Sequence, residues 1–316
     1  MTTQQEPGSI FRRGGPTRLM YYLGKYMPPS IAGVVVRGIA QILLAAKPAN
    51  YYGALENLGH VLPPQTSEKE LLQAVRRLFH YSTLSYYHLF HNLGRSEFSL
   101  ETFQPRVEMS PEARGYLEQA VAAGRGLFLL GSHSSNFDLA GIALSYYAPS
   151  PPQALSYADP PPGFEFVNNL RRRGRGTITP ISPDTLREAM QRLRSGGIVL
   201  TGVDRPLPNG SEPVTFFGET AHLPTGYMRI PLITDCLVMT VSFAYDGSVY
   251  RILANPPMEM VRSGNREDDV LVNVHRVLAQ IEDFIRAAPD QWMVFSPVWP
   301  DGRDGDLAVD RSEVRT

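Results

Sequence analysis

Hydrophobic and polar positions divide this chain into a helical first third and an alternating remainder. Residues 50–95 carry apolar side chains at helical spacing, including Leu71, Val75 and Leu78. After Pro111, short apolar runs alternate with helical patterns. We predict strands at 126–130, 154–157, 177–181, 197–202, 237–244, 249–254 and 292–295. We predict helices at 114–123, 136–147, 163–173, 184–195, 225–234 and 268–287.

This alternation favours an α/β fold with a mostly parallel central sheet covered by helices on both faces. With 43% of its 316 residues hydrophobic, the chain can bury a substantial core. We divide it into an N-terminal helical, membrane-associating subregion (1–110) and an α/β core (111–300). The remaining residues, 301–316, are rich in Asp, Gly and Arg and are predicted to be a disordered tail.

The chain places a histidine and a carboxylate five positions apart, His133 and Asp138, directly after the predicted strand 126–130. On one ideal helix the two would lie about 140° apart, so His133 must precede a helix that opens between 134 and 136. Asp138 would then occupy the first turn and reach back to the imidazole. Such a pair can take a proton from an alcohol, which indicates acyl transfer to a hydroxyl. A structural cap pair has the same spacing.

Four blocks of this sequence resemble one family. His133-Ser-Ser-Asn-Phe-Asp138 resembles the H-x4-D/E signature of the lysophospholipid acyltransferase superfamily, in the form typical of its bacterial lipid A and phosphatidylinositol mannoside acyltransferase branch. Three downstream blocks resemble that branch in the same order, namely 169–174 (Asn-Leu-Arg-Arg-Arg-Gly), 197–205 (Gly-Ile-Val-Leu-Thr-Gly-Val-Asp-Arg) and 214–226, which contains Phe-Phe-Gly-Glu and Pro-Thr-Gly. The resemblance covers residues 45–300.

The resemblance implies an O-acyltransferase with His133 as general base and Asp138 holding the imidazole. The acyl donor would be a thioester, acyl-coenzyme A or acyl carrier protein, and the acceptor a hydroxyl of a membrane lipid. An acidic residue near Asp204 contributes to the active site in that family. Asp204 could orient His133, order the acceptor, or pair with Arg205 in an ordinary loop salt bridge. The candidate substrate contacts are Asn136, Arg171, Arg173, Arg205, Phe216, Phe217, Gly218, Glu219 and Gly226.

Some of these candidates have a plainer alternative. The arginines at 171–173 can hold phosphates of the donor or of a lipid headgroup, but a solvated helix end has the same pattern. Core packing would account equally for Phe216 and Phe217. A helix start at Gly226 would let backbone N–H groups approach an anion or a developing oxyanion. His88 and His91 lack a third ligand, so we assign no metal, and no cofactor beyond the acyl donor.

Two differences from the family pattern bear on the identity of the acceptor lipid. Asp138 stands where lipid A enzymes usually carry Glu, and Phe137 where Trp is common. The resemblance therefore ranks a mannosylated phosphatidylinositol or other glycolipid first, a lipid A precursor second and a lysophospholipid third. Two other classes stay open. Serines at 132, 134 and 135 would allow a lipid hydrolase, although no G-x-S-x-G motif occurs. A lipid-binding scaffold without chemistry would keep the same fold.

The N-terminal end predicts contact with a membrane surface. Residues 1–47 hold six basic residues against the single acidic Glu6, whereas the whole chain has a net charge of −1, which argues against a nucleic-acid partner. Residues 31–46 are apolar but contain Arg37 and fall short of the roughly 20 residues that cross a bilayer. We expect a helix in the membrane plane; a helix packed on the core is the alternative. No signal peptide is apparent, so we expect a peripheral or monotopic protein on the cytoplasmic face of the cell membrane.

Overall fold

The computed structural model describes residues 13–95, 99–207 and 210–299. The predicted tail at 301–316 lies outside them. Within the described residues, seven strands form one sheet in the order β1-β9-β8-β2-β5-β3-β4. These strands are β1 (Val107–Met109), β2 (Leu127–Gly131), β3 (Gln153–Ser156), β4 (Thr177–Pro180), β5 (Ile198–Gly202), β8 (Leu237–Tyr245) and β9 (Tyr250–Ala254). The hairpin of β6 (Ser211–Phe216) and β7 (Glu219–Pro224) stands apart from the sheet.

The sheet is mostly parallel, as predicted. Strands β8, β2, β5, β3 and β4 run in the same direction, while β9 pairs antiparallel with β8 and parallel with β1. The register that matters for the site joins β2 to β5, because Gly131 lies opposite Gly202. These two strands therefore end at the same edge of the sheet. The predicted domain boundary at 110 falls just after β1, so the first strand of the sheet lies within the predicted N-terminal subregion.

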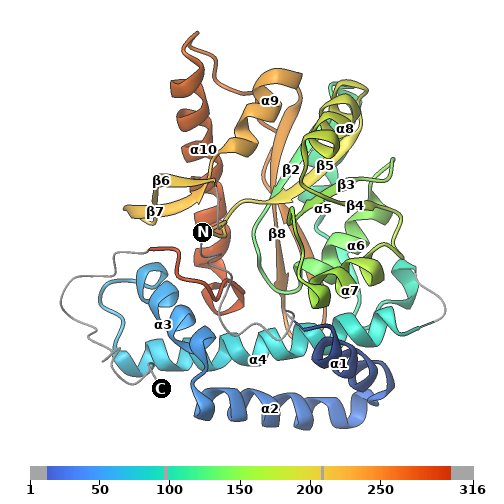
Figure 1. Cartoon of the computed structure of the whole chain (residues 1–316), viewed down its shortest axis with the longest axis vertical. Helices are drawn as coiled ribbons and strands as arrows, with labels where there is room; N and C mark the ends of the chain where they lie inside the picture. Colours follow the sequence, from blue (N-terminus) through green and yellow to red (C-terminus); the bar gives the residue numbers. More distant parts are fainter. Residues whose placement is uncertain (1–12, 96–98, 208–209, 300–316) are drawn as a thin grey trace.

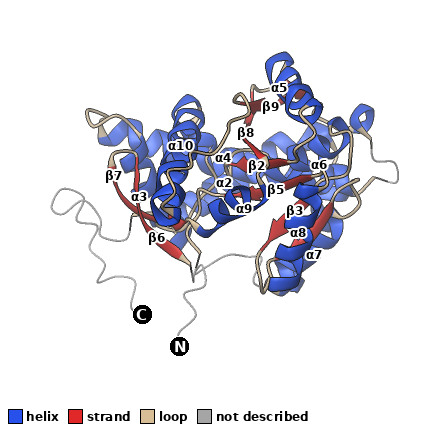
Figure 2. Ribbon diagram, turned by 90° about the horizontal axis from the view of Figure 1, so that it is seen from above, coloured by secondary structure: helices blue, strands red, loops and turns tan. Residues whose placement is uncertain are grey.

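Both faces of the sheet are covered, because the side chains of β2 are buried on each side. Leu127 and Leu129 belong to one core, which includes residues of α5 (Pro111–Ala122) and α6 (Phe137–Tyr147). Phe128 and Leu130 alternate with them and belong to a second core. That core includes residues of α8 (Pro183–Arg194), α9 (Arg229–Thr234) and α10 (Arg266–Ala287). Figure 2 shows β6 and β7 beside α10, away from β3 and β4. The predicted fold class is confirmed.

The N-terminal helices form a separate layer below the sheet (Figure 1). Helix α4 (Glu68–Leu93) begins with a capping box, in which Ser67 and Glu70 each accept a hydrogen bond from the other's backbone N–H. Helices α1 (Gly14–Tyr26), α2 (Pro29–Ala46) and α3 (Ala49–Val61) pack against it. Only three residues of α2, Ala32, Val36 and Ala40, are buried. Most of α2 therefore faces outward.

Several elements differ from the predictions. Helix α1, strand β1 and the β6–β7 hairpin were not predicted. The predicted strand at 292–295 is wrong. Those residues do not join the sheet, and Trp292 makes only an isolated bridge to Ser134. The reason is that this segment runs along the loop after β2, whose backbone needs partners of its own.

Candidate active site

The loop of residues 132–136, here called the catalytic loop, leads from β2 into α6. Asn136 is the N-cap of α6, and its Oδ1 accepts a hydrogen bond from the backbone N–H of Leu139 at 3.1 Å. His133 therefore precedes the helix and Asp138 lies in its first turn, as the spacing predicts. This arrangement leaves His133 at the carboxyl edge of the sheet, beside the end of β5.

His133 is held by Asp204, which follows β5. Its Nδ1 lies 2.6 Å from Asp204 Oδ1, and its backbone N–H donates to Asp204 Oδ2 at 2.8 Å. Asp204 is fully buried, and the side chain of His133 is only 14% exposed. The two residues are 71 positions apart in the chain. Of the three roles open to Asp204 in the sequence, the contacts match the orientation of His133.

The imidazole packs against Gly202, the last residue of β5. A Cβ at this position would lie 2.9 Å from His133 Nε2 and closer still to Cε1, so glycine leaves the space that the ring occupies. On another side the ring meets Phe137 edge-on, with centroids 5.1 Å apart. No hydrogen bond to Nε2 occurs within the described part of the chain. The ring is thus fixed through Nδ1 while Nε2 stays available.

Asp204 is set up to remain ionised. Burial alone would raise its pKa, but the positive charge of His133 in its protonated form, two hydrogen bonds from His133 and one from Trp292 outweigh burial and hold the pKa below its ordinary value. When the imidazole is neutral, an ionised Asp204 favours the tautomer in which Nδ1–H donates a hydrogen bond to Oδ1 and the lone pair lies on Nε2. That tautomer is the one a general base requires. Trp292 was not among the predicted site residues, because nothing in the local pattern links it to a loop 88 positions away.

The predicted contact between Asp138 and the imidazole is wrong. Asp138 is buried and forms an ion pair with Arg171, in the last turn of α7 (Pro162–Arg171). Burial raises the pKa of Asp138 above its ordinary value, although the charge of Arg171 opposes this. The reason for the error is that Asp204 comes from the adjacent strand and already occupies Nδ1. Asp138 instead joins α6 to α7, with Arg171 as its partner.

Arg205 follows Asp204 and lies over the ring of Tyr157, 4.6 Å from the centroid. Its Nε is buried and has no hydrogen-bond partner among the described residues. The same is true of Arg171 Nε and the Tyr227 hydroxyl. Burial, together with the charge of Asp204, raises the pKa of Tyr227. Buried polar groups without partners are uncommon in folded proteins, and here several gather around one edge of the sheet.

Two predicted substrate contacts have structural partners. The side chain of Asn136 is buried, caps α6 through Oδ1, and donates from Nδ2 to the carbonyl of Ser85 at 2.7 Å. The guanidinium of Arg173 donates to the backbone carbonyls of Leu93 and Arg95, at the end of α4. The buried side chain of Asn136 therefore holds the loop in place, which corrects its predicted role. Arg173 is exposed and holds the end of α4, and its contact with substrate stays a prediction.

Most of the block 214–226 lies in the β6–β7 hairpin. Phe216 is fully buried and stacks on Trp299 with ring centroids 5.7 Å apart, so its role is packing, not substrate contact.

Phe217 and Gly218 form the turn and have positive φ angles of 52° and 79°. The backbone N–H of Phe217 donates to Glu282 at 2.7 Å, and Glu219 pairs with His60 at 2.8 Å. Gly226 is exposed at the start of a short 3-10 turn, Gly226–Met228. Substrate contact by Phe217, Gly218, Glu219 and Gly226 stays a prediction.

The serines beside His133 do not face its imidazole. Ser132 lies 2.9 Å from Ser134 and 2.7 Å from Ser242, all measured between hydroxyl oxygens. The hydroxyl oxygen of Ser135 lies 2.7 Å from the hydroxyl oxygen of Ser85. Ser132, Ser134 and Ser135 are buried. Among the described residues, therefore, no serine of the catalytic loop is hydrogen-bonded to His133 as a hydrolase nucleophile would be.

Comparisons with known proteins identify a family and several similar sequences. The family model described as bacterial lipid A biosynthesis acyltransferase matches residues 19–300. Phosphatidylinositol mannoside acyltransferase from Mycobacterium tuberculosis is 24% identical over 187 residues, which is 58% of this chain and 58% of that protein. The protein of the same name from Mycolicibacterium smegmatis is also 24% identical over 187 residues, 58% of this chain and 60% of that protein. The matched stretch thus spans less than two thirds of these relatives.

A solved structure also resembles the chain. It is the 1-acyl-sn-glycerophosphate acyltransferase from Thermotoga maritima, with 17% identity and a TM-score of 0.37. The alignment covers 82% of this chain and 98% of that one.

Proposed function

The chain belongs to the bacterial lipid A biosynthesis acyltransferase family, and from this premise we propose that it moves a fatty acyl chain from a thioester donor to a hydroxyl of a membrane lipid. One observation carries the proposal: His133 is anchored through Nδ1 to a buried carboxylate, at 2.6 Å, while Nε2 stays available. This arrangement suits the removal of a proton from an alcohol. We also propose that neither a cofactor nor a metal takes part beyond the acyl donor.

In the proposed mechanism, Nε2 of His133 takes the proton of the acceptor hydroxyl as its oxygen attacks the thioester carbonyl. The imidazolium is stabilised by Asp204 across the short contact at Nδ1. A tetrahedral oxyanion forms, and Arg205 is the positive group we assign to it, because its Nε is unpartnered and it follows Asp204 directly. Collapse breaks the carbon–sulfur bond, and His133 returns its proton to the departing thiolate.

No acyl-enzyme is needed, so the direct transfer fits the buried serines of the catalytic loop. A lipid hydrolase would need a nucleophile or an activated water at the same imidazole, and the hydroxyls of Ser132, Ser134 and Ser135 are hydrogen-bonded elsewhere. A lipid-binding scaffold would have no need of an ionised, buried carboxylate on His133. Both alternatives are outcomes of the experiment below.

We propose a glycolipid acceptor of the mannosylated phosphatidylinositol type. Two observations support it: the relatives compared above are phosphatidylinositol mannoside acyltransferases, and the acid five residues after His133 is Asp138. A lipid A precursor ranks second and a lysophospholipid third. The donor is acyl-coenzyme A or acyl carrier protein. Arg171 is the proposed link to the acceptor phosphate or donor phosphate, because it lies near Asp138 with one buried N–H unpartnered.

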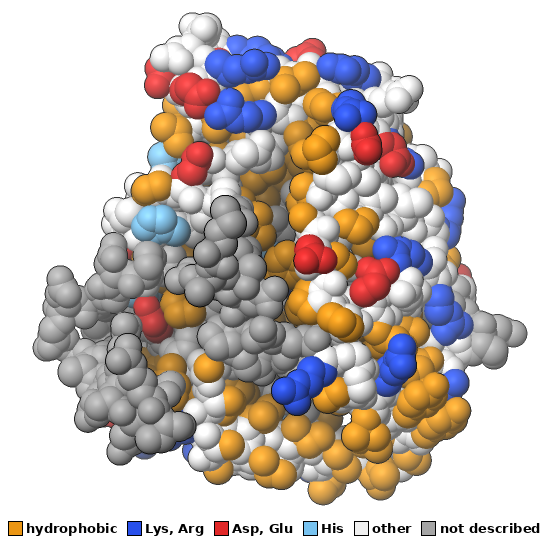
Figure 3. Space-filling model, viewed as in Figure 1, with side chains coloured by type: hydrophobic (Ala, Val, Ile, Leu, Met, Phe, Trp, Pro, Cys, Tyr) orange, Lys and Arg blue, Asp and Glu red, His pale blue; other side chains and the backbone are white. Residues whose placement is uncertain are grey.

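We propose that α1 and α2 attach the protein to the cytoplasmic face of the cell membrane. Within the described residues, α2 is the one helix long and apolar enough to cross a membrane by length and composition. Both helices expose large apolar side chains, here called the α1–α2 apolar face: Leu19, Tyr22, Leu23, Tyr26, Ile31, Val34, Ile39 and Ile42. Figure 3 shows hydrophobic side chains crowding the lower end of the molecule, where Figure 1 places these helices. Because α2 also packs on α4 through Ala32 and Val36, it would lie in the membrane plane rather than cross it.

The test is mass spectrometry of membrane lipids after incubation with the purified protein and a palmitoyl thioester. We expect one lipid heavier by a single acyl group with the unmodified protein and with His275→Ala, a control at an exposed histidine of α10. His133→Ala should not form it. Release of free fatty acid without a heavier lipid would establish the hydrolase. A His133→Ala protein that restores growth or lipid content to a deletion strain would establish the scaffold and overturn the proposal.

Membrane attachment has a separate test. Ile42→Glu places a charge on the α1–α2 apolar face, at a side chain that is 69% exposed. We expect it to weaken sedimentation with vesicles of anionic phospholipid. The matched control is Val272→Glu on α10, also exposed, which should sediment like the unmodified protein. Equal binding by all three proteins would contradict the proposed orientation.

A further inference from the structure

A short segment near the end of the described chain, Gln291 to Met293, runs beside the catalytic loop. The backbone N–H of Met293 donates to the carbonyl of His133 at 2.8 Å, and the backbone N–H of Ser135 donates to the carbonyl of Gln291 at 2.9 Å. Trp292 pairs with Ser134 between these two bonds. The main chain from His133 to Ser135 is therefore fixed by residues about 160 positions later.

The side chain of Trp292 points at the catalytic carboxylate. Its indole N–H donates to Asp204 Oδ2 at 2.8 Å, and both side chains are buried, with Trp292 1% exposed. Asp204 Oδ2 also accepts the backbone N–H of His133 at 2.8 Å. These two donors hold one carboxylate oxygen and turn the other, Oδ1, toward Nδ1 of the imidazole. The orientation of the Asp204 carboxylate follows because Oδ2 accepts two hydrogen bonds and Oδ1 is left for the imidazole.

We propose that Trp292 is a positioning residue for acyl transfer, which holds Asp204 through its indole N–H and the catalytic loop through its backbone. This inference rests on the proposed function of His133 and Asp204. Trp292 does not touch the reacting atoms and acts through Asp204. Catalytic groups lose effectiveness when their geometry drifts by a fraction of an ångström, so a donor that fixes the carboxylate affects the rate even though it lies behind the pair.

The chain provides a matched control. It contains two tryptophans, and Trp299 is 2% exposed, close to the 1% of Trp292. Both indoles pack on Phe216, with centroids 6.2 Å away for Trp292 and 5.7 Å away for Trp299. The indole N–H of Trp299 donates to the carbonyl of Phe216 at 3.3 Å rather than to Asp204. Replacing either ring by phenylalanine removes a similar buried group, but only one replacement removes a donor to Asp204.

We expect Trp292→Phe to lower kcat by about 10-fold to 100-fold, while KM for the palmitoyl thioester stays within about threefold. Trp299→Phe should keep kcat within about threefold of the unmodified protein. A kcat for Trp292→Phe equal to that of Trp299→Phe would overturn the inference and leave the proposed function intact. An unmodified protein that transfers no acyl group to any membrane lipid would overturn both.

A spectroscopic measurement tests whether the Trp292 indole holds Asp204, even if the Trp292→Phe variant does not fold. Two tryptophans give two indole N–H signals in a nitrogen–proton correlation spectrum, and Trp299→Phe assigns them. We expect Asp204→Asn to shift the Trp292 signal, because a charged acceptor becomes a neutral one, and to leave the Trp299 signal in place. If the Trp292 signal does not move, the indole does not hold Asp204 and the inference fails.

Discussion

The two ends of the parallel strands carry the same residue types and use them differently. At the carboxyl end, Asp204 is fully buried and His133 and Arg171 are 14% and 16% exposed as side chains. At the amino end, Arg125 precedes β2 and Asp235 precedes β8, and their side chains are 35% and 70% exposed. One end therefore holds charged groups that are mostly shielded from water, while the other holds charged groups that are more exposed.

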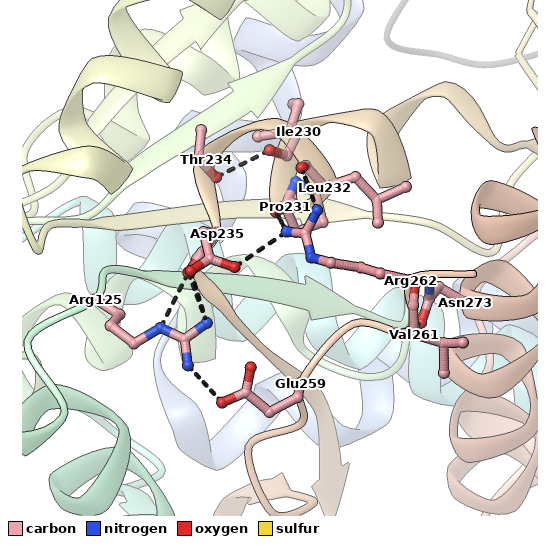
Figure 4. A network of polar contacts seen from close by, with 10 residues as sticks. All are labelled: Arg125, Ile230, Pro231, Leu232, Thr234, Asp235, Glu259, Val261, Arg262 and Asn273. Carbon is pink, nitrogen blue, oxygen red and sulfur yellow. Dashed lines mark hydrogen bonds and ion pairs between the residues drawn. The ribbon is translucent and has the colours of Figure 1, made fainter. Parts of the chain in front are cut away.

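The polar groups at the two ends of the strands also differ in their hydrogen-bond partners. The amino-end network is closed, as Figure 4 shows: Arg125 donates to the Asp235 carbonyl at 2.9 and 3.1 Å and pairs with Glu259, and Arg262 donates to the Leu232 carbonyl at 2.8 Å. The carboxyl end leaves Arg171 Nε, Arg205 Nε and the Tyr227 hydroxyl without partners among the described residues. The amino end has such groups as well, Gln153 Oε1 at the start of β3 and Arg192 Nε beside Pro151, so the contrast is with the Arg125 network alone. The unpartnered groups of the carboxyl edge lie at the end of the strands where ligands bind in parallel sheets.

The largest expected effect separates the two ends by activity. Asp204→Asn removes the negative charge that stabilises the imidazolium and lets Nδ1 lose its proton, so we expect kcat to fall about 100-fold to 10,000-fold. The matched variant at the amino end is Asp235→Asn, which should keep its activity. Initial rates of lipid acylation at saturating thioester measure both. Similar rates for the two variants would remove the distinction between the two ends.

The second prediction concerns the buried ion pair of Asp138 and Arg171. Arg171→Met leaves the carboxylate buried without its partner, so we expect a loss of about 3–5 kcal/mol in the free energy of unfolding. Urea denaturation at neutral pH measures it. The double variant Arg171→Met/Asp138→Leu removes both charges and should recover most of the loss. If the double variant is no more stable than the single one, the cost lies in packing rather than in the uncompensated charge.

The third prediction uses pH to distinguish the two carboxylates of the carboxyl end. The pKa of Asp204 is below its ordinary value of 3.8, so its ionised form contributes stability above pH 3.8 that is lost as the pH falls through the lowered pKa. The pKa of Asp138 is above 3.8, so its neutral form contributes stability that is lost as the pH rises through the raised pKa. Relative to the unmodified protein, Asp204→Asn should therefore lose stability with rising pH and Asp138→Asn should gain it, each by at most about 1.4 kcal/mol per pH unit. The Asp204 effect lies at and below pH 3.8 and the Asp138 effect at and above it, so urea midpoints should be measured from about pH 2 to about pH 7. Slopes of the same sign for the two variants in these two ranges would contradict the prediction.

Much of the fold and part of the site could be predicted from the sequence. Alternating apolar runs predict the parallel strands, and the N-cap at Asn136 places His133 before α6. The order of strands in the sheet is not contained in such local patterns. Because β5 lies next to β2, Asp204 reaches Nδ1 first and Asp138 is left to Arg171. Trp292 was missed for the same reason, since only the folded chain brings it within 2.8 Å of Asp204.

The smallest expected effect lies at the amino end and tests whether its network is only structural. Arg125→Met breaks the ion pairs with Asp235 and Glu259, whose side chains are 70% and 66% exposed. Because exposed pairs are weakened by water and salt, we expect a loss of no more than about 1 kcal/mol, smaller still in 1 M salt, and an unchanged kcat. Urea denaturation at two salt concentrations, together with the acylation assay, measures both quantities. A clear fall in kcat at unchanged stability would mean that the Arg125 network also influences the geometry at the carboxyl edge, through β2. The contrast between the two ends of the strands would then not hold.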